Sequence, residues 1–409
     1  MKYMIIGGGC AGVEAAREIR RRDNDGKITV VDDSGENFIF RPALKEYLMG
    51  EIWEEELKGL PIDFFYDNRI DFLNGKIVSL DVRNSIITME KNGRKSIKKF
   101  DKLLLAIGGK PNLPPYLTDH DFRNVFQFKS VKDTNRIKSF LKKSNGPCVV
   151  IGGGVLGVET AELLSRMGRK VTLLSRSENL VFHGIPKDMK HRVRNLFEKN
   201  GVEILTSKKV TDIRTTEDRL TALVLDDGKV LKLDLCIACT GISPDLKLAQ
   251  DADLEISKGI HVNPSMRTSK ENIFAAGDCA VMDWNSRKTL RLWEPSRRMG
   301  RVAGANMAGG DETFNPYPSF YHTYLFGVPL GFFGDFDAVG EDYHRIIRKT
   351  DKEYRDLVIK NGSLVGASFM GGRPAPPPFV HLMRSGKKIP GGFNQLLDDD
   401  FDMERLWYL

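Results

Sequence analysis

Cysteine is scarce in this chain, and long apolar runs are missing. The five cysteines among 409 residues form an odd, sparse set that is typical of a reduced compartment. No apolar run reaches the ~18 residues of a membrane-spanning helix. A glycine motif already begins at Gly7, which leaves no room for a signal or transit peptide. We therefore expect a cytoplasmic protein without an integral membrane segment, although a peripheral membrane contact stays open.

The spacing of Cys236 and Cys239 is that of a redox or zinc pair, but the surrounding segment argues against both. "LKLDLCIACTG" is an apolar run with strand character. Residues three apart in a strand point to opposite faces and lie about 10 Å apart. They cannot close a disulfide without a break in the strand. We therefore expect no functional cysteine pair here, and we predict no metal site.

The chain is moderately basic, with a formal net charge of +7 and a pI of about 9.0. Its basic residues stand in short clusters that alternate with acids, and they are not interleaved with aromatic residues as on a nucleic-acid platform. We therefore expect no nucleic-acid partner. Two interpretations remain open, a solvated face or electrostatic steering of an acidic protein partner.

One phrase occurs twice, as "IIGGGCAGVEAAR" and "VIGGGVLGVETAE". In each copy a predicted buried strand runs into a glycine turn, a helix and a second strand, which is the β-α-β unit that binds dinucleotides. The first glycine permits the turn, the second admits a pyrophosphate and the third lets helix and strand pack closely. These glycines are Gly7, Gly9 and Gly12 in the first copy, and Gly152, Gly154 and Gly157 in the second.

The two copies differ where the second strand ends. Asp32 lies about 20 residues beyond the first loop, where an acid binds the adenosine ribose. The matching position of the second copy holds Ser175, followed by Arg176. A serine can donate a hydrogen bond to a phosphate oxygen, and an arginine can bind the phosphate with charge-assisted bonds. This favours NADPH over NADH, with use of both cofactors as the alternative.

The duplication covers a whole domain plan. Each β-α-β unit is followed by a hairpin, with Asn92-Gly93 and Asp227-Gly228 as the turns. From about Phe314 aromatic and strand-like segments dominate, followed by "RPAPPP" and an acidic tail whose role stays open. We predict an α/β fold with two Rossmann-like dinucleotide-binding domains and a smaller, mostly antiparallel C-terminal α+β domain.

With two nucleotide sites, the sequence resembles the FAD-dependent pyridine nucleotide–disulfide oxidoreductase superfamily. "LLLAIG" is similar to the crossover strand of its flavin domain, and "NIFAAGDC" to its second FAD motif. The resemblance implies an FAD-binding domain over residues 1–112 and 243–313, an NAD(P)-binding domain over 113–242 and a C-terminal interface domain over 314–409. The first glycine loop would serve FAD, and the second NADPH or NADH.

The segment "ENFIFRPALKEYLMGEI" contains no cysteine, whereas the disulfide branches of the superfamily carry one there. "FRPALKEYL" instead resembles the rubredoxin, ferredoxin and putidaredoxin reductases and apoptosis-inducing factor. The resemblance implies that Arg41 and Pro42 lie along FAD, and that Lys45 and Glu159 are catalytic where nicotinamide meets flavin. The alternative for Glu159 is a place in the first turn of a helix, favoured by the dipole.

"LWEPSRRMGRVAGANMAG" resembles the segment whose helix N-terminus points at the flavin, with Trp293 and Glu294 immediately before it. "YPSFYHTYLFG" resembles an aromatic segment at the flavin, so Tyr321 is a candidate neighbour, with core packing as the alternative. The implied cofactor-binding set further comprises Cys10, Ala11, Asp33, Ala106, Gly108, Gly277, Asp278, Pro295, Leu156 and Gly241.

We therefore predict an FAD-dependent NAD(P)H oxidoreductase that reduces a rubredoxin- or ferredoxin-type acceptor, a small and acidic electron-carrier protein. One alternative is an NAD(P)H oxidase or quinone reductase. The other is a redox sensor and interaction protein resembling apoptosis-inducing factor. The sequence leaves the acceptor and the oligomeric state open, with a homodimer among the options.

Overall fold

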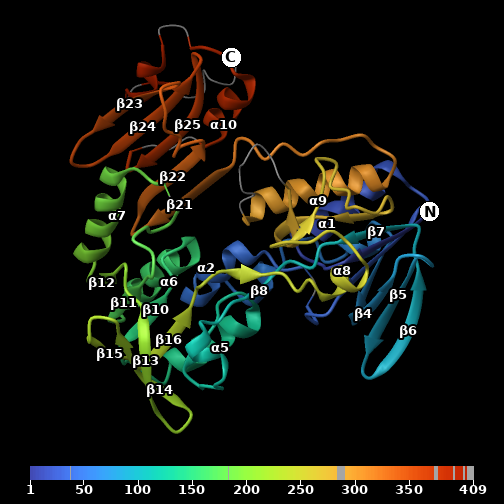
Figure 1. The fold of residues 1–409 in the computed structure, drawn as a ribbon, viewed down its shortest axis with the longest axis horizontal. Coiled ribbons are helices and arrows are strands. Elements are labelled where there is room, and N and C mark those ends of the chain that lie inside the picture. Colours follow the sequence, from blue (N-terminus) through green and yellow to red (C-terminus); the bar gives the residue numbers. More distant parts are fainter. Residues whose placement is uncertain are drawn as a thin grey trace. The chain divides into compact units, whose positions relative to one another are not determined.

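The computed structural model describes residues 1–36, 38–182, 184–282, 291–372, 376–389, 392–398 and 401–402. They form two compact units, which Figure 1 shows in one ribbon. The first unit comprises Met1–Asn112, Lys129–Thr134 and Ile242–Pro316, and the second comprises Leu113–Phe128, Asn135–Gly241 and Tyr317–Leu409. The predicted three-domain boundaries are a finer division and stay a prediction.

The first unit is built on a parallel five-stranded sheet with the strand order β19-β7-β1-β2-β3. Apolar residues fill the strands β19, β7, β1 and β2, which are largely buried as parallel strands require, whereas the edge strand β3 is partly exposed. Helix α9 packs against α1, where a Cβ at Gly300 would lie only 2.1 Å from the carbonyl oxygen of Ala11. The bounds are β1 Lys2–Ile6, α1 Cys10–Arg22, β2 Lys27–Asp32, α2 Leu44–Met49, α3 Phe64–Asp67, β3 Ile70–Asn74, β7 Lys102–Leu105, α8 Lys247–Asp251, β19 Ile273–Ala275 and α9 Trp293–Met307.

The second unit repeats this plan in the parallel sheet β12-β11-β10-β16-β9. In both sheets the strand before the glycine loop is flanked by the second strand of its β-α-β unit and by a crossover strand. The predicted pair of dinucleotide-binding folds is thereby confirmed. The bounds are α4 Pro115–Thr118, β9 Val125–Phe126, β10 Cys148–Ile151, α6 Val155–Arg166, β11 Val171–Leu174, α7 Lys187–Lys199, β12 Val202–Leu205 and β16 Leu235–Ala238.

Both predicted hairpins are present. In the first unit β5 (Ile86–Lys91) and β6 (Arg94–Lys99) are joined at Asn92 and Gly93, whose φ angles of +50° and +74° suit a type I′ turn. β4 (Lys76–Asp81) completes that sheet. In the second unit β14 (Arg219–Leu225) lies between β13 (Val210–Thr216) and β15 (Val230–Lys232), with Gly228 at the turn.

The C-terminal part of the second unit is an antiparallel sheet in the order β21-β22-β25-β24-β23, as predicted. Helix α10 (Pro376–Ser385) packs on it, and Phe333, Phe369 and Phe379 form the core between them. Residues 373–375 of the proline-rich stretch, and 399–400 and 403–409 of the acidic tail, lie outside the described residues. The strands are β21 Phe320–Leu325, β22 Val328–Gly334, β23 Tyr343–Lys349, β24 Tyr354–Lys360 and β25 Ser363–Met370. Within the described residues, no helix has the length and apolar character to cross a bilayer.

Candidate active site

Both glycine loops have the backbone that a close-packed dinucleotide loop requires. Gly7 and Gly152 adopt φ angles of +109° and +123°, which residues with a side chain rarely reach. A Cβ on Gly12 or Gly157 would lie 2.0 or 1.8 Å from the carbonyl oxygen of the first glycine of its own loop. The first glycine therefore turns the chain, and the third lets the helix pack on the turn.

The helix that follows each loop begins open to an anion. Glycine is the N-cap of α1 and of α6, and neither first turn carries an acid or a side-chain cap. The N–H groups there lack intrahelical partners, and the helix dipole favours negative charge. A Cβ on Gly154 would meet no atom of the described residues within 4 Å, and one on Gly9 would meet first Nη1 of Arg41, at 3.4 Å. Each loop thus fits a pyrophosphate.

The ends of the second strands differ as the sequence indicates. Asp32 accepts hydrogen bonds from the N–H groups of Gly8, at 2.6 Å, and Ser34, at 2.8 Å. This fixes its carboxylate beneath the first loop. Ser175 is 3% exposed, and its Oγ accepts a hydrogen bond from the N–H of Ser177 at 3.2 Å. Arg176 is exposed. The first strand end therefore presents a carboxylate, and the second a hydroxyl beside a guanidinium.

A second acid stands in the first unit. Asp278 accepts a hydrogen bond from Oγ of Ser296 at 3.2 Å. Burial raises the pKa of Asp278. The largest opposing effect is the positive charge of Lys129, which lowers that pKa. Burial, followed by the charge of Arg41, lowers the pKa of Lys129. Sequence reasoning missed Lys129, because no motif surrounds it and its partners are distant in sequence. A part-buried carboxylate among cations suits the polar ribityl–phosphate part of FAD.

Helix α9 corrects one expectation. Trp293 and Glu294 lie in its first turn rather than before it, and Pro295 is accommodated there because that turn needs few N–H donors. Oε2 of Glu294 is buried without a hydrogen-bond partner in the described part of the chain, so a bound group with a donor would satisfy it. Trp293 packs against Phe38 and Phe40, with ring centroids 5.7 and 5.1 Å apart. This polar and aromatic corner fits a flat heteroaromatic ring.

The other predicted cofactor residues lie around the two loops, and their roles stay predictions. In the first unit Asp33, Arg41 and Pro42 are exposed, whereas Cys10, Ala11 and Ala106 are buried. Leu156, in the first turn of α6, is 40% exposed. Outside the two loops, the predicted glycines Gly108, Gly241 and Gly277 all have positive φ angles.

Glu159 lies beyond the first turn of α6, so the helix dipole alone does not account for it. Its Oε1 accepts hydrogen bonds from the hydroxyl of Tyr321, at 2.8 Å, and from Oγ1 of Thr323, at 2.7 Å. Tyr321 is therefore placed by a polar contact as well as by packing. Lys45 lies in α2 of the first unit, and its catalytic role stays a prediction. Sequence reasoning missed Thr323, whose only signal is the i, i+2 spacing from Tyr321.

All five cysteines are buried and free. Burial is the largest cause of the raised pKa of each thiol. The pKa is raised to about 11 at Cys148, to about 12 at Cys10, Cys239 and Cys279, and still higher at Cys236. Redox and nucleophilic chemistry needs the thiolate, and these groups stay protonated near neutral pH. In the described residues, no cluster of three or more His, Cys, Asp or Glu side chains is placed to hold a metal ion.

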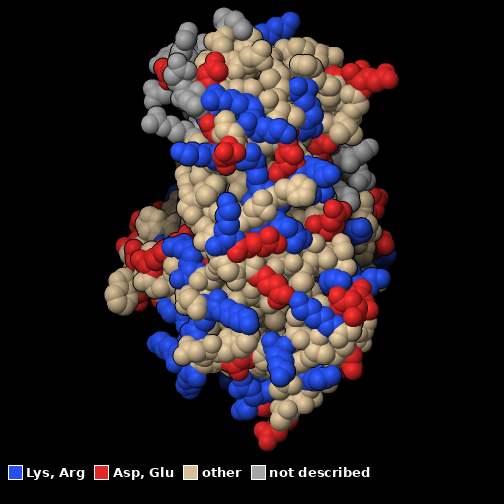
Figure 2. Space-filling model, turned by 90° about the vertical axis from the view of Figure 1, so that its left-hand side faces the viewer, with Lys and Arg blue, Asp and Glu red and all other residues tan. Residues whose placement is uncertain are grey.

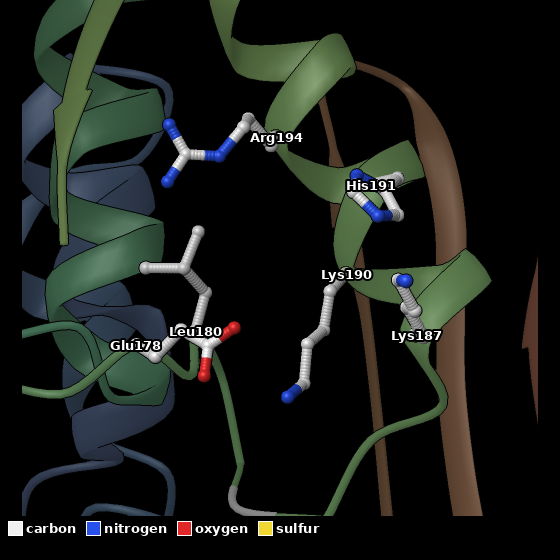
Figure 3. Close-up of a pocket in the computed structure, with 6 residues that line it drawn as sticks. All are labelled: Glu178, Leu180, Lys187, Lys190, His191 and Arg194. Atoms are coloured by element: carbon white, nitrogen blue, oxygen red, sulfur yellow. The ribbon is translucent and has the colours of Figure 1, made fainter. Parts of the chain in front are cut away.

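A cavity of about 290 Å³ opens between α7 and the loop that follows β11 (Figure 3). The carboxylate of Glu178 and the amine of Lys190 both project into it. Arg194 donates to the carbonyl oxygen of Ile204 at 3.2 Å and to Oγ1 of Thr206 at 2.8 Å. Cations outnumber acids in the lining, which comprises Glu178, Leu180, Lys187, Lys190, His191 and Arg194. Such a cavity, a few residues beyond Arg176, suits a phosphate.

Comparison with known proteins agrees with this geometry. Residues 1–307 match the family described as pyridine nucleotide-disulphide oxidoreductase. The chain belongs to this family. It is 31% identical over 325 residues to an NADH oxidase of Methanocaldococcus jannaschii, across 77% of this chain and 72% of the oxidase. It is 28% identical over 366 residues to a rubredoxin-NAD(+) reductase of Ectopseudomonas oleovorans, across 88% of this chain and 92% of the reductase. The structure of an NAD-dependent persulfide reductase from A. fulgidus is similar with a TM-score of 0.87 and 26% identity, over 98% of this chain and 79% of that one.

As a member of the pyridine nucleotide-disulphide oxidoreductases, the chain is an NAD(P)H-dependent flavoprotein oxidoreductase that uses FAD. When bound, FAD supplies the capacity to accept a hydride and to release its electrons to an acceptor. The protein's own part is to bind and orient. Each uncapped helix N-terminus would receive a pyrophosphate, and the residues at the two strand ends would contact the ribose groups.

Proposed function

We propose that this family member passes electrons from NADPH, in preference to NADH, to a small iron–sulfur or rubredoxin-type carrier protein. The absence of cysteine from "ENFIFRPALKEYLMGEI", together with five buried and protonated thiols elsewhere, is the observation that carries the choice of acceptor. A disulfide substrate would find no thiolate with which to exchange. A one-electron metal centre needs none. The relative named as a rubredoxin-NAD(+) reductase supports the same choice.

The surface charge supports an acidic carrier. The chain has a formal net charge of +7. On the face seen in Figure 2, Lys and Arg side chains are widely spread and interspersed with Asp and Glu. A basic surface of this kind accelerates the encounter with an acidic protein, and salt weakens the effect. We therefore expect the rate of carrier reduction to fall as ionic strength rises.

Two features support NADPH as the reductant. The end of β11 presents Ser175 and Arg176 where the first loop has a carboxylate, so no acid at those two positions repels a 2′-phosphate. The cavity beside α7 adds the cations Lys190 and Arg194, which lie on that helix and line the cavity together with Glu178. An arginine and a lysine near the ribose are the groups that bind a phosphate with charge-assisted hydrogen bonds.

Anaerobic reduction of the purified holoenzyme followed by an acceptor screen tests the proposal. The flavin is reduced with one equivalent of NADPH, and its reoxidation is followed with rubredoxin, a [2Fe–2S] ferredoxin, a quinone, oxygen and a low-molecular-weight disulfide. We expect a carrier protein to reoxidise the flavin fastest, with a rate that falls with added salt. Faster reoxidation by the disulfide would contradict the absence of a thiol relay, and slow reoxidation by both carriers would refute their role.

The relationship to an NADH oxidase favours a second candidate, in which oxygen is the acceptor. Such an enzyme consumes oxygen steadily with NAD(P)H alone. Oxygen uptake in the absence of any carrier, measured against the rate of carrier reduction in the same preparation, separates the two functions.

A further inference from the structure

The helix that carries the second glycine loop is tied to the C-terminal sheet by two carboxylates. Glu159 accepts hydrogen bonds from Tyr321 and Thr323, at 2.8 and 2.7 Å. One turn further along α6, Oε1 of Glu162 accepts a hydrogen bond from the N–H of Phe326 at 3.1 Å. Tyr321 and Thr323 belong to β21, and Phe326 lies in the turn between β21 and β22. The hairpin β21–β22 thus holds α6 at two successive acidic positions.

The two donors to Glu159 are themselves well fixed. They stand two residues apart on β21, so both side chains point to the same face of the strand. Thr323 is 5% exposed. Burial, followed by the charge of Glu159, raises the pKa of Tyr321 well above its usual value. The phenol therefore remains protonated at any working pH and donates to the carboxylate throughout.

The glycine loop and Tyr321 are also joined by the loop after β11. The ring of Phe182 packs edge-on against Tyr321, with centroids 5.2 Å apart. The preceding residue, Val181, has a φ of +66°, and its N–H donates to the carbonyl oxygen of Gly153 at 2.8 Å. A β-branched residue rarely adopts that φ, so the surrounding contacts must hold it there. One short loop therefore contacts both the pyrophosphate loop and the aromatic side chain that binds Glu159.

We propose that Tyr321 and Thr323 are positioning residues that fix the carboxylate of Glu159 for its contact with the nicotinamide. The inference rests on the proposed role of Glu159 and not on the identity of the electron acceptor. A glutamate side chain has three torsions, and two donors on one oxygen restrict all of them. The hairpin of the C-terminal sheet is in this way part of the nicotinamide site, although it lies more than 150 residues from the glycine loop in sequence.

The test uses Tyr321→Phe and Thr323→Val, which keep the size of each side chain and remove one donor. Tyr324→Phe is the matched control, because Tyr324 lies on the same strand and is 57% exposed. Anaerobic stopped-flow measures the limiting rate of flavin reduction by NADPH and by NADH. We expect each variant to lower that rate roughly ten-fold, the effect of one hydrogen bond to a charged group. The control should stay within about two-fold of the parent.

Three further readouts separate positioning from general damage. Calorimetric binding of 2′,5′-ADP, which fills only the adenosine half of the site, should be unchanged. The rate ratio of parent to Tyr321→Phe should stay constant between pH 6.5 and 9.5, because the phenol does not titrate there. In a Glu159→Gln background, each of the two substitutions should lower the limiting rate of flavin reduction by less than a further factor of about two.

An equal loss in the Glu159→Gln background would show that the donors do not act through Glu159, and so would overturn the inference. Unaltered flavin reduction in both variants, or in Glu159→Gln itself, would do the same. Because only the reduction of flavin is measured, failure of every carrier protein to accept electrons refutes the proposed acceptor and leaves this result intact.

Discussion

Replacing Arg176 with alanine should weaken the use of NADPH and spare the use of NADH. A charge-assisted hydrogen bond to a phosphate contributes about 1.5–3 kcal/mol, and an exposed ion pair about 0.2–1 kcal/mol. Arg176 is exposed, and Ser175 beside it is buried, so the contact falls between these limits. At about 1–2 kcal/mol the expected loss in kcat/KM for NADPH is roughly 5–30-fold.

The assay compares kcat/KM for NADPH and NADH with one acceptor at saturating concentration. Lys199→Ala is the control, because Lys199 is an exposed cation at the far end of α7 and its loss changes the net charge equally. The effect of Arg176→Ala should shrink at high salt, since exposed charges are screened. The control should change neither cofactor's kcat/KM by more than about two-fold.

A companion variant reverses the chemistry of the strand end. Ser175→Asp places a carboxylate where the first loop carries Asp32, and Oγ of Ser175 already lies 2.6 Å from the place of a Cβ on Gly153. Two like charges 4 Å apart repel by ~1 kcal/mol in water and by ~4 kcal/mol at an effective dielectric constant of 20. NADPH should therefore lose more in this variant than in Arg176→Ala, while NADH gains an acceptor for its ribose hydroxyls.

The reasoning fails if the parent enzyme prefers NADH, or if Arg176→Ala lowers kcat/KM equally for both cofactors. Either result would mean that Arg176 does not bind the 2′-phosphate. The cations beside α7 would then be the next groups to test for such a role.

Three other predictions follow from buried groups and from the loops. Extraction of the purified yellow protein should release FAD, since the first loop is built for a pyrophosphate that FMN lacks; FMN in the extract would refute the assignment. Replacing all five cysteines with serine should leave steady-state turnover within a few-fold, because their thiols stay protonated, and loss of turnover with reducible flavin would reveal a thiol step. Burial lowers the pKa of His322 in the folded state. The neutral imidazole therefore contributes to the free energy of unfolding above pH ~6.5, and this contribution is lost as the pH falls through the folded-state pKa. His322→Gln should therefore lose less unfolding free energy than the parent between pH 7.5 and 5.5, measured by thermal denaturation with exposed His344→Gln as the control.

Local sequence patterns were sufficient to predict most of the fold. The strand, glycine turn and helix of each loop follow from apolar runs that meet a fixed glycine spacing, and Asn92-Gly93 marks a hairpin by its own backbone preference. These features depend on residues that are neighbours in the chain. Because Asp32 ends β2 and Ser175 directly follows β11, their places next to the loops were predictable as well.

The contacts that complete the sites could not be predicted, because they join distant segments. Nothing near Lys129 in sequence indicates that its charge would influence Asp278, and nothing near Thr323 points to Glu159. The start of α9 was misplaced for a different reason. A proline is expected at the first position of a helix. No residue of the first turn, however, needs its N–H for an intrahelical hydrogen bond, so a proline is tolerated anywhere in that turn. Pro295 therefore did not show that α9 begins at Trp293.

The duplicated loops show how one backbone can serve two ligands. A Cβ on the third glycine would lie 2.0 Å from the carbonyl oxygen of the first glycine in one loop and 1.8 Å from it in the other. Neither loop can therefore carry a side chain at that position that would distinguish between ligands. Specificity must then come from what surrounds the loop. In the first unit these groups are Asp32 below the loop and Arg41 beside it. In the second they are Ser175 and Arg176 at the end of β11, and the hairpin β21–β22, which contacts α6. Exchanging the strand-end residue alone should therefore alter the choice of nicotinamide cofactor, whereas exchanging residues of the hairpin should alter the rate of flavin reduction with either one.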